Sequence, residues 1–109
     1  MAITYKVLGQ SNPSATTATT LYTVPSATSA LISTINVCNQ AATNGTFRIA
    51  IRPAGATLTA AHYLAYDTVI PANDMMSITI GITLATTDVI TVYASSATMS
   101  FHAYGNEIT

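Results

Sequence analysis

Apolar and polar residues alternate in short runs along the chain, and turn residues separate the runs. Alternation with a period of two places every second side chain on one face, which is typical of a half-buried β-strand. The run from Thr46 to Arg52 is the cleanest example, and Pro53 ends it. The pattern predicts seven or eight strands, at residues 3–8, 21–24, 31–38, 46–52, 62–70, 77–84, 89–94 and 99–104.

The alternation also predicts which side chains form the core. Three sets of residues each share one face of a strand: Phe47, Ile49 and Ile51; Ile78, Ile80 and Ile82; and Leu31, Ile35 and Val37. We expect the first set to point inward and to pack against the second or the third across a sandwich about 10 Å thick. Arg48, Ala50 and Arg52 then point outward. Residues 89–94 are apolar at both parities, so we expect this strand to be covered on both sides.

Turn residues give the connections between the strands. Asn44 and Gly45 both tolerate positive φ, and this pair predicts a hairpin joining residues 31–38 to residues 46–52. Residues 14–20, SATTATT, have neither periodicity nor bulk, and they read as a loop or as an arm lying on another surface. Asp74 and Asp88 lie in predicted turns, where Asp commonly bonds the local backbone.

These features predict an all-β fold, because no helical pattern separates the strands. We expect a single antiparallel β-sandwich of about seven or eight strands, jelly-roll-like or Greek-key, covering residues 1–109. Residues 1–20 would supply an N-terminal strand and an extended arm. We favour the jelly roll over an immunoglobulin-like sandwich, since the Cys and Trp hallmarks of true immunoglobulin domains are absent from the sequence.

Charge and cysteine content exclude several classes of protein. The chain carries three Lys or Arg residues and four Asp or Glu residues, for a net charge of −1. Three basic residues cannot build a patch for nucleic acid or anionic lipid, so we expect neither nucleic-acid nor membrane partners. Cys38 is the only cysteine, which excludes an intramolecular disulfide, and we expect a buried, reduced thiol. The N-terminus lacks the pattern of a signal peptide, so synthesis in the cytoplasm is expected.

Candidate catalytic groups are few. His62, His102 and Asp67 have no local motif of a nucleophile or metal site around them. We therefore expect no enzyme, assign no catalytic, cofactor-binding or metal-ligating residue, and expect no cofactor. Six tyrosines are scattered, with Tyr63 and Tyr66 on opposite faces of one strand. We interpret them as packing residues, although a contiguous exposed patch would indicate sugar or protein binding.

Few charges also favour association between copies of the chain. Ala, Thr and Ser lose little side-chain entropy when buried, and one Lys in the chain leaves sheet edges weakly protected. These features predict a homo-oligomer. Arg48 and Arg52 could pair with acidic residues of a neighbouring subunit or form a solvated face. Met75 and Met76 follow a turn, and we expect them to fill the core or to adapt to an interface.

Two segments resemble small virion structural proteins of tailed bacteriophages, including those of cyanobacteria. They are LYTVPSATSALISTINVCNQAATNGTFRIAIR, from Leu21 to Arg52, and IPANDMMSITIGITLATTDVITVYASSATMSFHAYG, from Ile70 to Gly105. The motifs that carry the resemblance are LYTVP at the start, the strand FRIAIRP, the turn IPAND and the closing DVITVYAS. Residues 1–19 lie outside this likeness.

The resemblance implies a non-enzymatic component of a virion. Its members lie on capsids and on tails, so we expect a capsid cement or decoration protein that stabilises capsomer contacts. The alternative is a tail, baseplate or fibre-associated domain that contacts the host surface. The implied partners are the phage major capsid protein or other virion proteins, and a trimer is the preferred oligomer because phage decoration and fibre proteins often have three-fold symmetry.

Overall fold

The computed structural model describes residues 2–109, and 59% of the chain lies in β-strands. No α-helix occurs in this range, and the two 3-10 turns are η1 (Pro53–Gly55) and η2 (Ala60–His62). The strands are β1 (Ile3–Ser11), β2 (Thr19–Thr23), β3 (Ser29–Asn39), β4 (Gly45–Arg52), β5 (Tyr63–Ile70), β6 (Met75–Ile78), β7 (Ile82–Leu84), β8 (Val89–Ala94) and β9 (Met99–Ile108). The predicted all-β class is confirmed.

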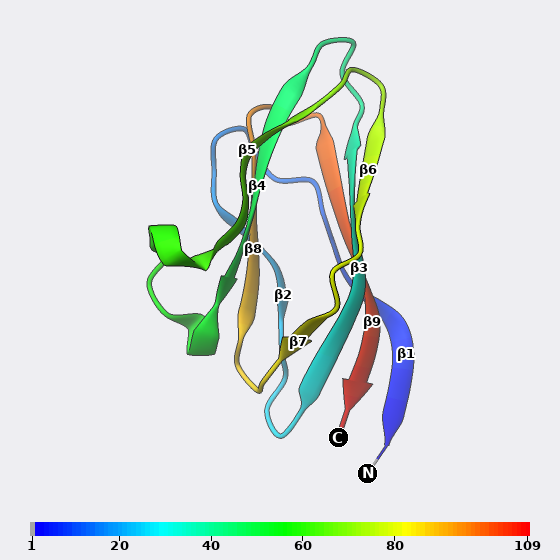
Figure 1. Cartoon of the computed structure of the whole chain (residues 1–109), viewed down its shortest axis with the longest axis vertical. Coiled ribbons are helices and arrows are strands. Elements are labelled where there is room, and N and C mark those ends of the chain that lie inside the picture. The colour runs from blue at the N-terminus through cyan, green and yellow to red at the C-terminus, as the bar shows by residue number, and fades with distance from the viewer. Residues whose placement is uncertain (1) are drawn as a thin grey trace.

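The strands form two antiparallel sheets packed face to face (Figure 1). Sheet A has the order β1-β9-β3-β6, with β7 also paired to β3, and sheet B has the order β2-β8-β4-β5. The first strand thus pairs with the last, the second with the second-last, β3 with both β6 and β7, and β4 with β5. A long hairpin folded over in this way is a jelly roll, which confirms the favoured architecture.

The core lies between the sheets and contains much of the predicted set. Phe47 of sheet B and Phe101 of sheet A meet edge to face, with ring centroids 6.2 Å apart. Ile49, Ile35 and Val37 are fully buried in the same cluster. Ile51, Ile78 and Ile82 are partly buried and pack against its margin. The prediction that Phe47 and Ile49 point inward is confirmed.

Alternation predicts the wrong face for two apolar residues, Leu31 and Ile80. Leu31 is 37% exposed, because the pairing of β3 with β9 shifts between Ile32 and Thr34 and leaves Ser33 as an extra residue. Such a bulge reverses the parity of the strand, so Ile32 rather than Leu31 is buried. Ile80 is exposed because the predicted strand 77–84 is interrupted between β6 and β7, where Gly81 has φ +64°.

The predicted hairpin at Asn44 and Gly45 is wrong. β3 and β4 belong to different sheets, so the segment between them crosses from one layer to the other. Asn39 is buried at the start of this crossing, and its side-chain amide donates to the carbonyls of Thr43, at 2.9 Å, and Pro71, at 3.2 Å. The amide thus satisfies carbonyls in two connections, the β3–β4 crossing and the β5–β6 turn.

The N-terminal segment contains the predicted strand, and of the two predicted forms of residues 14–20, a loop or an arm, the structure has a loop that leads into β2. Strand β1 continues to Ser11 and pairs with β9, while Thr19 and Thr20 already belong to β2. The Thr16 amide donates to the carbonyl of Ala94 at 2.8 Å, which fastens the intervening turn to the end of β8. This segment is therefore part of the sandwich.

Strand β8 is covered on both sides, as predicted, and five of its six residues are buried. On the outer side, η1 contacts β8 and η2 contacts β4, where both turns project from sheet B (Figure 1). Ala50 points outward, as predicted, but both Ala50 and Thr91 are buried beneath this cover. Arg52 holds this covering segment by donating to Thr91 Oγ1 at 3.0 Å and to the carbonyl of Ala56 at 3.2 Å.

Candidate functional site

Strand β5 is irregular at the point where its tyrosines lie. Its pairing with β4 moves from Phe47–Thr68 to Ile49–Ala65, so two β5 residues, Tyr66 and Asp67, oppose a single β4 residue. Asp67 adopts φ +49°, a left-handed conformation that Asp tolerates better than most residues. A bulge of this kind changes the direction of the side chains beside it.

A second shift in β4–β5 pairing follows at once, between Ile49 and Ala50. This second shift leaves Leu64 as an extra residue, so Tyr63 points to the same face as Tyr66. The two rings are in contact, with centroids 4.9 Å apart and planes at 83°. The prediction that these tyrosines lie on opposite faces is therefore wrong. Both belong to the outer surface of sheet B, where Tyr66 is 57% exposed.

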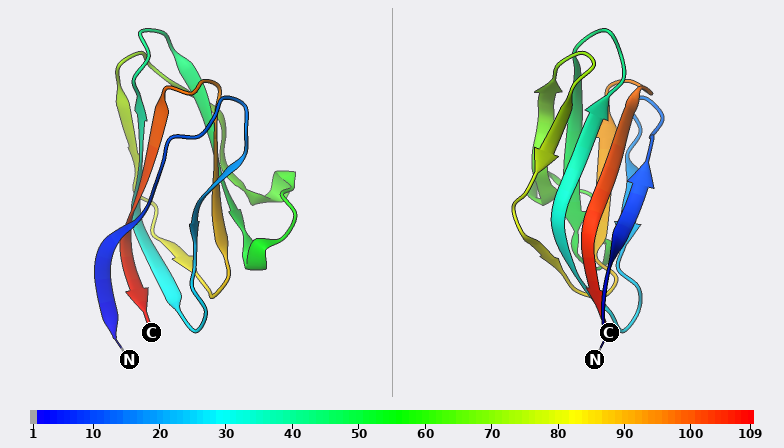
Figure 2. Two further views of the ribbon diagram at one scale, coloured as in Figure 1. Left: turned by 180° about the vertical axis from the view of Figure 1, so that it is seen from behind. Right: turned by 90° about the vertical axis from the view of Figure 1, so that its right-hand side faces the viewer.

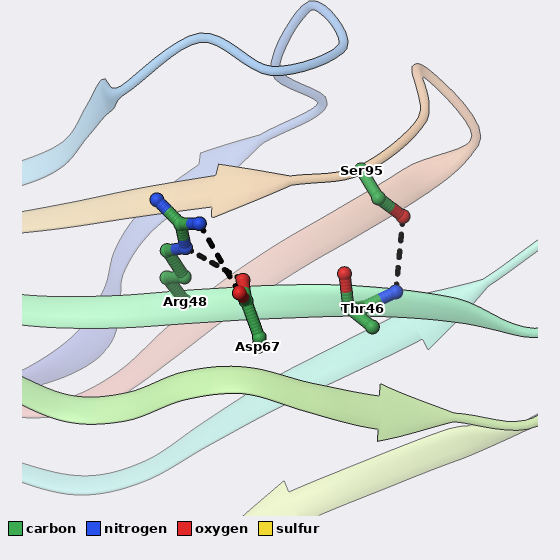
Figure 3. A network of polar contacts seen from close by, with 4 residues as sticks. All are labelled: Thr46, Arg48, Asp67 and Ser95. Atoms are coloured by element: carbon green, nitrogen blue, oxygen red, sulfur yellow. Dashed lines mark hydrogen bonds and ion pairs between the residues drawn. The ribbon is translucent and has the colours of Figure 1, made fainter.

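Arg48 of β4 organises the tyrosines around it. Its guanidinium carbon lies 4.1 Å from the centroid of the Tyr66 ring and 4.2 Å from that of Tyr93. Arg48 Nε donates to Asp67 Oδ1 at 2.7 Å and Nη2 donates to Oδ2 at 3.2 Å, as the side chains in Figure 3 show. We call Arg48, Tyr63, Tyr66, Asp67 and Tyr93 the tyrosine–arginine cluster.

Arg48 and Asp67 form a bidentate ion pair inside this cluster. Hydrogen bonds from Arg48 hold the pKa of the Asp67 carboxyl below its usual range, and the carboxylate raises the pKa of Arg48. The forked guanidinium reaches both carboxylate oxygens and still presents its flat faces to aromatic rings. Arg48 is therefore paired within the chain, which corrects the idea that it serves an acidic residue of a neighbouring subunit.

A groove runs beside the cluster. It is lined by Leu58, Thr59, Ala60, Tyr63 and Tyr66, opens to solvent and has a volume of about 620 Å³. Its rim is fastened by a capping box, in which the Thr59 amide donates to His62 Nδ1 at 3.1 Å and the Thr59 hydroxyl accepts from the His62 amide. His62 thus supports the turn that bounds the groove.

The other candidate groups lie apart from each other. His102, on β9, contacts Gln10 at 3.1 Å and stacks on Tyr104, whereas His62 belongs to η2 on the far side of the sandwich. Asp88 accepts the amides of Ala54 and Ala85, which confirms it as a turn former. Within residues 2–109, no three His, Cys, Asp or Glu side chains gather closely enough to hold a metal ion.

Two expectations about sulfur-containing residues need correction. Cys38 is only half-buried, because it lies on the outer face of β3, opposite the buried Val37 and Asn39. Met75 pairs with Cys38 across β3 and β6 and is exposed, so it does not fill the core. Met76 does pack against the core cluster.

A second surface covers the outer face of sheet A, seen from the front in the right-hand view of Figure 2. Cross-strand pairing aligns Val7 with Tyr104 and Tyr5 with Asn106, and Asn106 with Leu31. Tyr5 is 77% exposed. We call the exposed apolar residues of this surface the β1 face: Ile3, Tyr5, Val7, Leu31 and Tyr104.

The charged residues of sheet A do not join the β1 face. Lys6 and Glu107 alternate with its members, and their side chains pair at 2.8 Å on the inner side of the sheet edge. Glu107 also accepts a hydrogen bond from the hydroxyl of Tyr22, a buried residue of sheet B. Among the described strands of sheet A, the outer face therefore presents no Lys, Arg, Asp or Glu.

The sequence carried one signal for the tyrosine–arginine cluster. Asp67 stands in the middle of a predicted strand, where Asp is disfavoured, and this position proves to be the bulge. The convergence of Arg48, Tyr66 and Tyr93 from three strands required the sheet order.

Residues 2–109 include no helix with the length and hydrophobicity needed to span a membrane. Comparison of the chain with family models, with curated proteins and with solved structures finds no match.

Proposed function

We propose that this chain is a non-enzymatic structural protein of a tailed-bacteriophage virion, acting as a capsid cement or decoration protein. The observation that carries the proposal is the β1 face, where exposed apolar side chains stand on a sheet surface without charged residues. Contiguous apolar surface of this kind marks protein contacts. The resemblance of residues 20–105 to phage virion proteins supplies the biological setting.

In this proposal, the β1 face packs against a second copy of the chain or against the major capsid protein. Burying Tyr5, Val7 and Leu31 removes apolar area from water without desolvating a charge. Strand β1 is also an edge of sheet A, where unpaired backbone groups favour a neighbour. A trimer is the preferred arrangement, on the strength of the resemblance.

Light scattering of the purified protein tests the surface. We expect an oligomer that persists when salt rises from about 0.1 to 1 M, because screening affects ion pairs and leaves apolar contacts intact. Leu31→Glu places a charge on the β1 face and should give monomers. Leu64→Glu makes the same change at an exposed position of β5 on the other sheet and should leave the oligomer intact. Equal behaviour of the two variants would contradict a role for the β1 face.

The position in the particle needs a separate measurement. Quantitative gel analysis of purified virions should give a copy number that follows the major capsid protein in a fixed ratio, because a cement protein occupies every equivalent capsomer contact. A copy number matching the tail proteins instead would refute the capsid assignment.

The tail, baseplate or fibre role is the second candidate, and the tyrosine–arginine cluster favours it. This cluster lies on the outer surface of sheet B, on the side of the sandwich away from the β1 face. A subunit attached through the β1 face would therefore present the tyrosines and the groove outward. Exposed tyrosine beside arginine is a composition enriched at recognition sites.

A further inference from the structure

We infer that the groove beside Tyr63 and Tyr66 binds a neutral pyranose unit of a cell-surface polysaccharide. This inference deepens the host-contact role and rests on that second candidate function. The groove volume of about 620 Å³ falls within the ~300–1,000 Å³ range of small-ligand sites. Because the groove is open to solvent, a longer sugar chain can continue beyond the bound unit.

The shape of the groove suits a sugar ring. Tyr63 and Tyr66 stand nearly perpendicular and form a two-sided aromatic corner, and Leu58 and Ala60 add apolar lining. One face of a pyranose carries C–H bonds with partial positive charge, which pack favourably on the negative face of an aromatic ring. The hydroxyls of Thr59 and both tyrosines provide donors and acceptors for the equatorial hydroxyls of such a ring.

The charge of the groove selects a neutral ligand. The lining residues carry no formal charge, and the nearest cation, Arg48, is already bonded to both oxygens of Asp67. An anionic sugar would have to compete with this bidentate pair for the guanidinium. A neutral sugar has no such competition.

The site is also organised before any ligand arrives. Arg48 is held between the rings of Tyr66 and Tyr93, and the groove rim is tied by the Thr59–His62 capping box. A site that is already ordered loses little conformational entropy on binding. The shift in β5 pairing at Leu64 places Tyr63 beside Tyr66 on the solvent side of sheet B, where neither ring fills the core.

Amide chemical shifts in an NMR titration test the site on the intact chain. The probes are the methyl glycosides of glucose, galactose, mannose and N-acetylglucosamine, with N-acetylneuraminic acid as an anionic sugar and a proline-rich peptide as a competing class. We expect at least one neutral glycoside to give saturable shifts confined to residues 58–67. Shifts only with the anionic sugar or the peptide would overturn the inference, as would no response from any probe.

Substitutions then locate the contact. Tyr66→Ala should weaken binding by about tenfold or more, the loss expected when a central aromatic contact is removed. Tyr104→Ala is the matched control, since Tyr104 is an exposed tyrosine of the β1 face. Tyr66→Phe retains the ring and should keep most of the affinity. Unchanged binding by Tyr66→Ala would refute the site, with a thermal melt showing that the variant is folded.

Failure here is distinguishable from failure of the proposed function. Copy number and the light-scattering comparison of Leu31→Glu with Leu64→Glu do not involve the groove. A virion protein that binds no glycoside would retain its structural role, and a glycoside-binding protein absent from purified virions would retain its site.

Discussion

The substitution Ile→Ala at two positions gives a direct test of the sandwich. Alternation alone predicts that Ile49 and Ile80 both point inward, but in the structure Ile49 is 1% exposed and Ile80 is 57% exposed. The change removes three carbon atoms at either site, so the two variants differ in environment rather than in chemistry. A comparison between them therefore reports burial.

The expected losses follow from these exposures. Removing three fully buried carbons from Ile49 costs roughly 2.4 kcal/mol of transfer free energy, and the cavity left between the sheets adds about 1 kcal/mol. We expect Ile49→Ala to lower the free energy of unfolding by about 3–4 kcal/mol. Less than half of Ile80 is buried, so Ile80→Ala should cost no more than about 1 kcal/mol.

Urea unfolding followed by far-ultraviolet circular dichroism measures both losses, since the chain has no Trp to report by fluorescence. The slope of the free energy against urea should match between the variants and the parent protein. Equal losses at the two positions would refute the interruption of the strand at Gly81 and the placement of Ile80 in solvent.

Three further predictions address polar contacts. Asn39→Ala should lower the free energy of unfolding by about 2–4 kcal/mol, because carbonyls of the β3–β4 crossing and of the β5–β6 turn lose their donor. Asn36→Ala loses one bond to a serine hydroxyl and should cost far less, and urea unfolding measures both losses. Hydrogen bonds from Lys6 and then Tyr22 lower the pKa of Glu107, so its stabilisation is complete above pH 4.5 and is lost as the pH falls through the lowered folded-state pKa. Melting temperatures between pH 3 and 7 should therefore fall less steeply in Glu107→Gln, and parallel curves would contradict this. Arg48→Lys should reduce the near-ultraviolet tyrosine dichroism without changing the far-ultraviolet spectrum. The reason is that an ammonium group cannot stack on two rings and also bond both oxygens of a carboxylate. An unchanged near-ultraviolet signal would refute the stacking.

Most of the strands are predictable from the sequence because a half-buried strand has a local pattern of alternating apolar and polar residues. Burial on one face is visible in the alternation around Phe47 and Ile49. Burial on both faces is visible in residues 89–94, which are apolar at both parities. These features identified the strands, the sandwich and the doubly covered β8. Composition likewise limited the chemistry, since seven charged residues cannot supply a large basic or acidic surface.

The tyrosine–arginine cluster was not predictable in the same way. Tyr63 and Tyr66 share a face only because the pairing of β5 shifts at Leu64, between them, and a period-two pattern assumes that no such shift occurs. The same cause misplaced Leu31, where a bulge at Ser33 reverses the faces of β3. Whether a strand forms a bulge depends on the strand with which it pairs. The local sequence does not identify that strand, because it is distant along the chain.

The sequence by itself determined which segments of this chain become strands, because strand formation and half-burial depend on short-range alternation. Only the tertiary structure decided which strands became neighbours. That choice brought Arg48 to Asp67, and it placed Tyr5 and Leu31 in one row across sheet A, on either side of Asn106. The physical reason is that pairing is a competition among all strands for the same backbone donors and acceptors. The crossing at Asn39 shows the outcome: a local Asn-Gly signal favours a hairpin, yet burial of two sheets against one another stabilises a connection between layers.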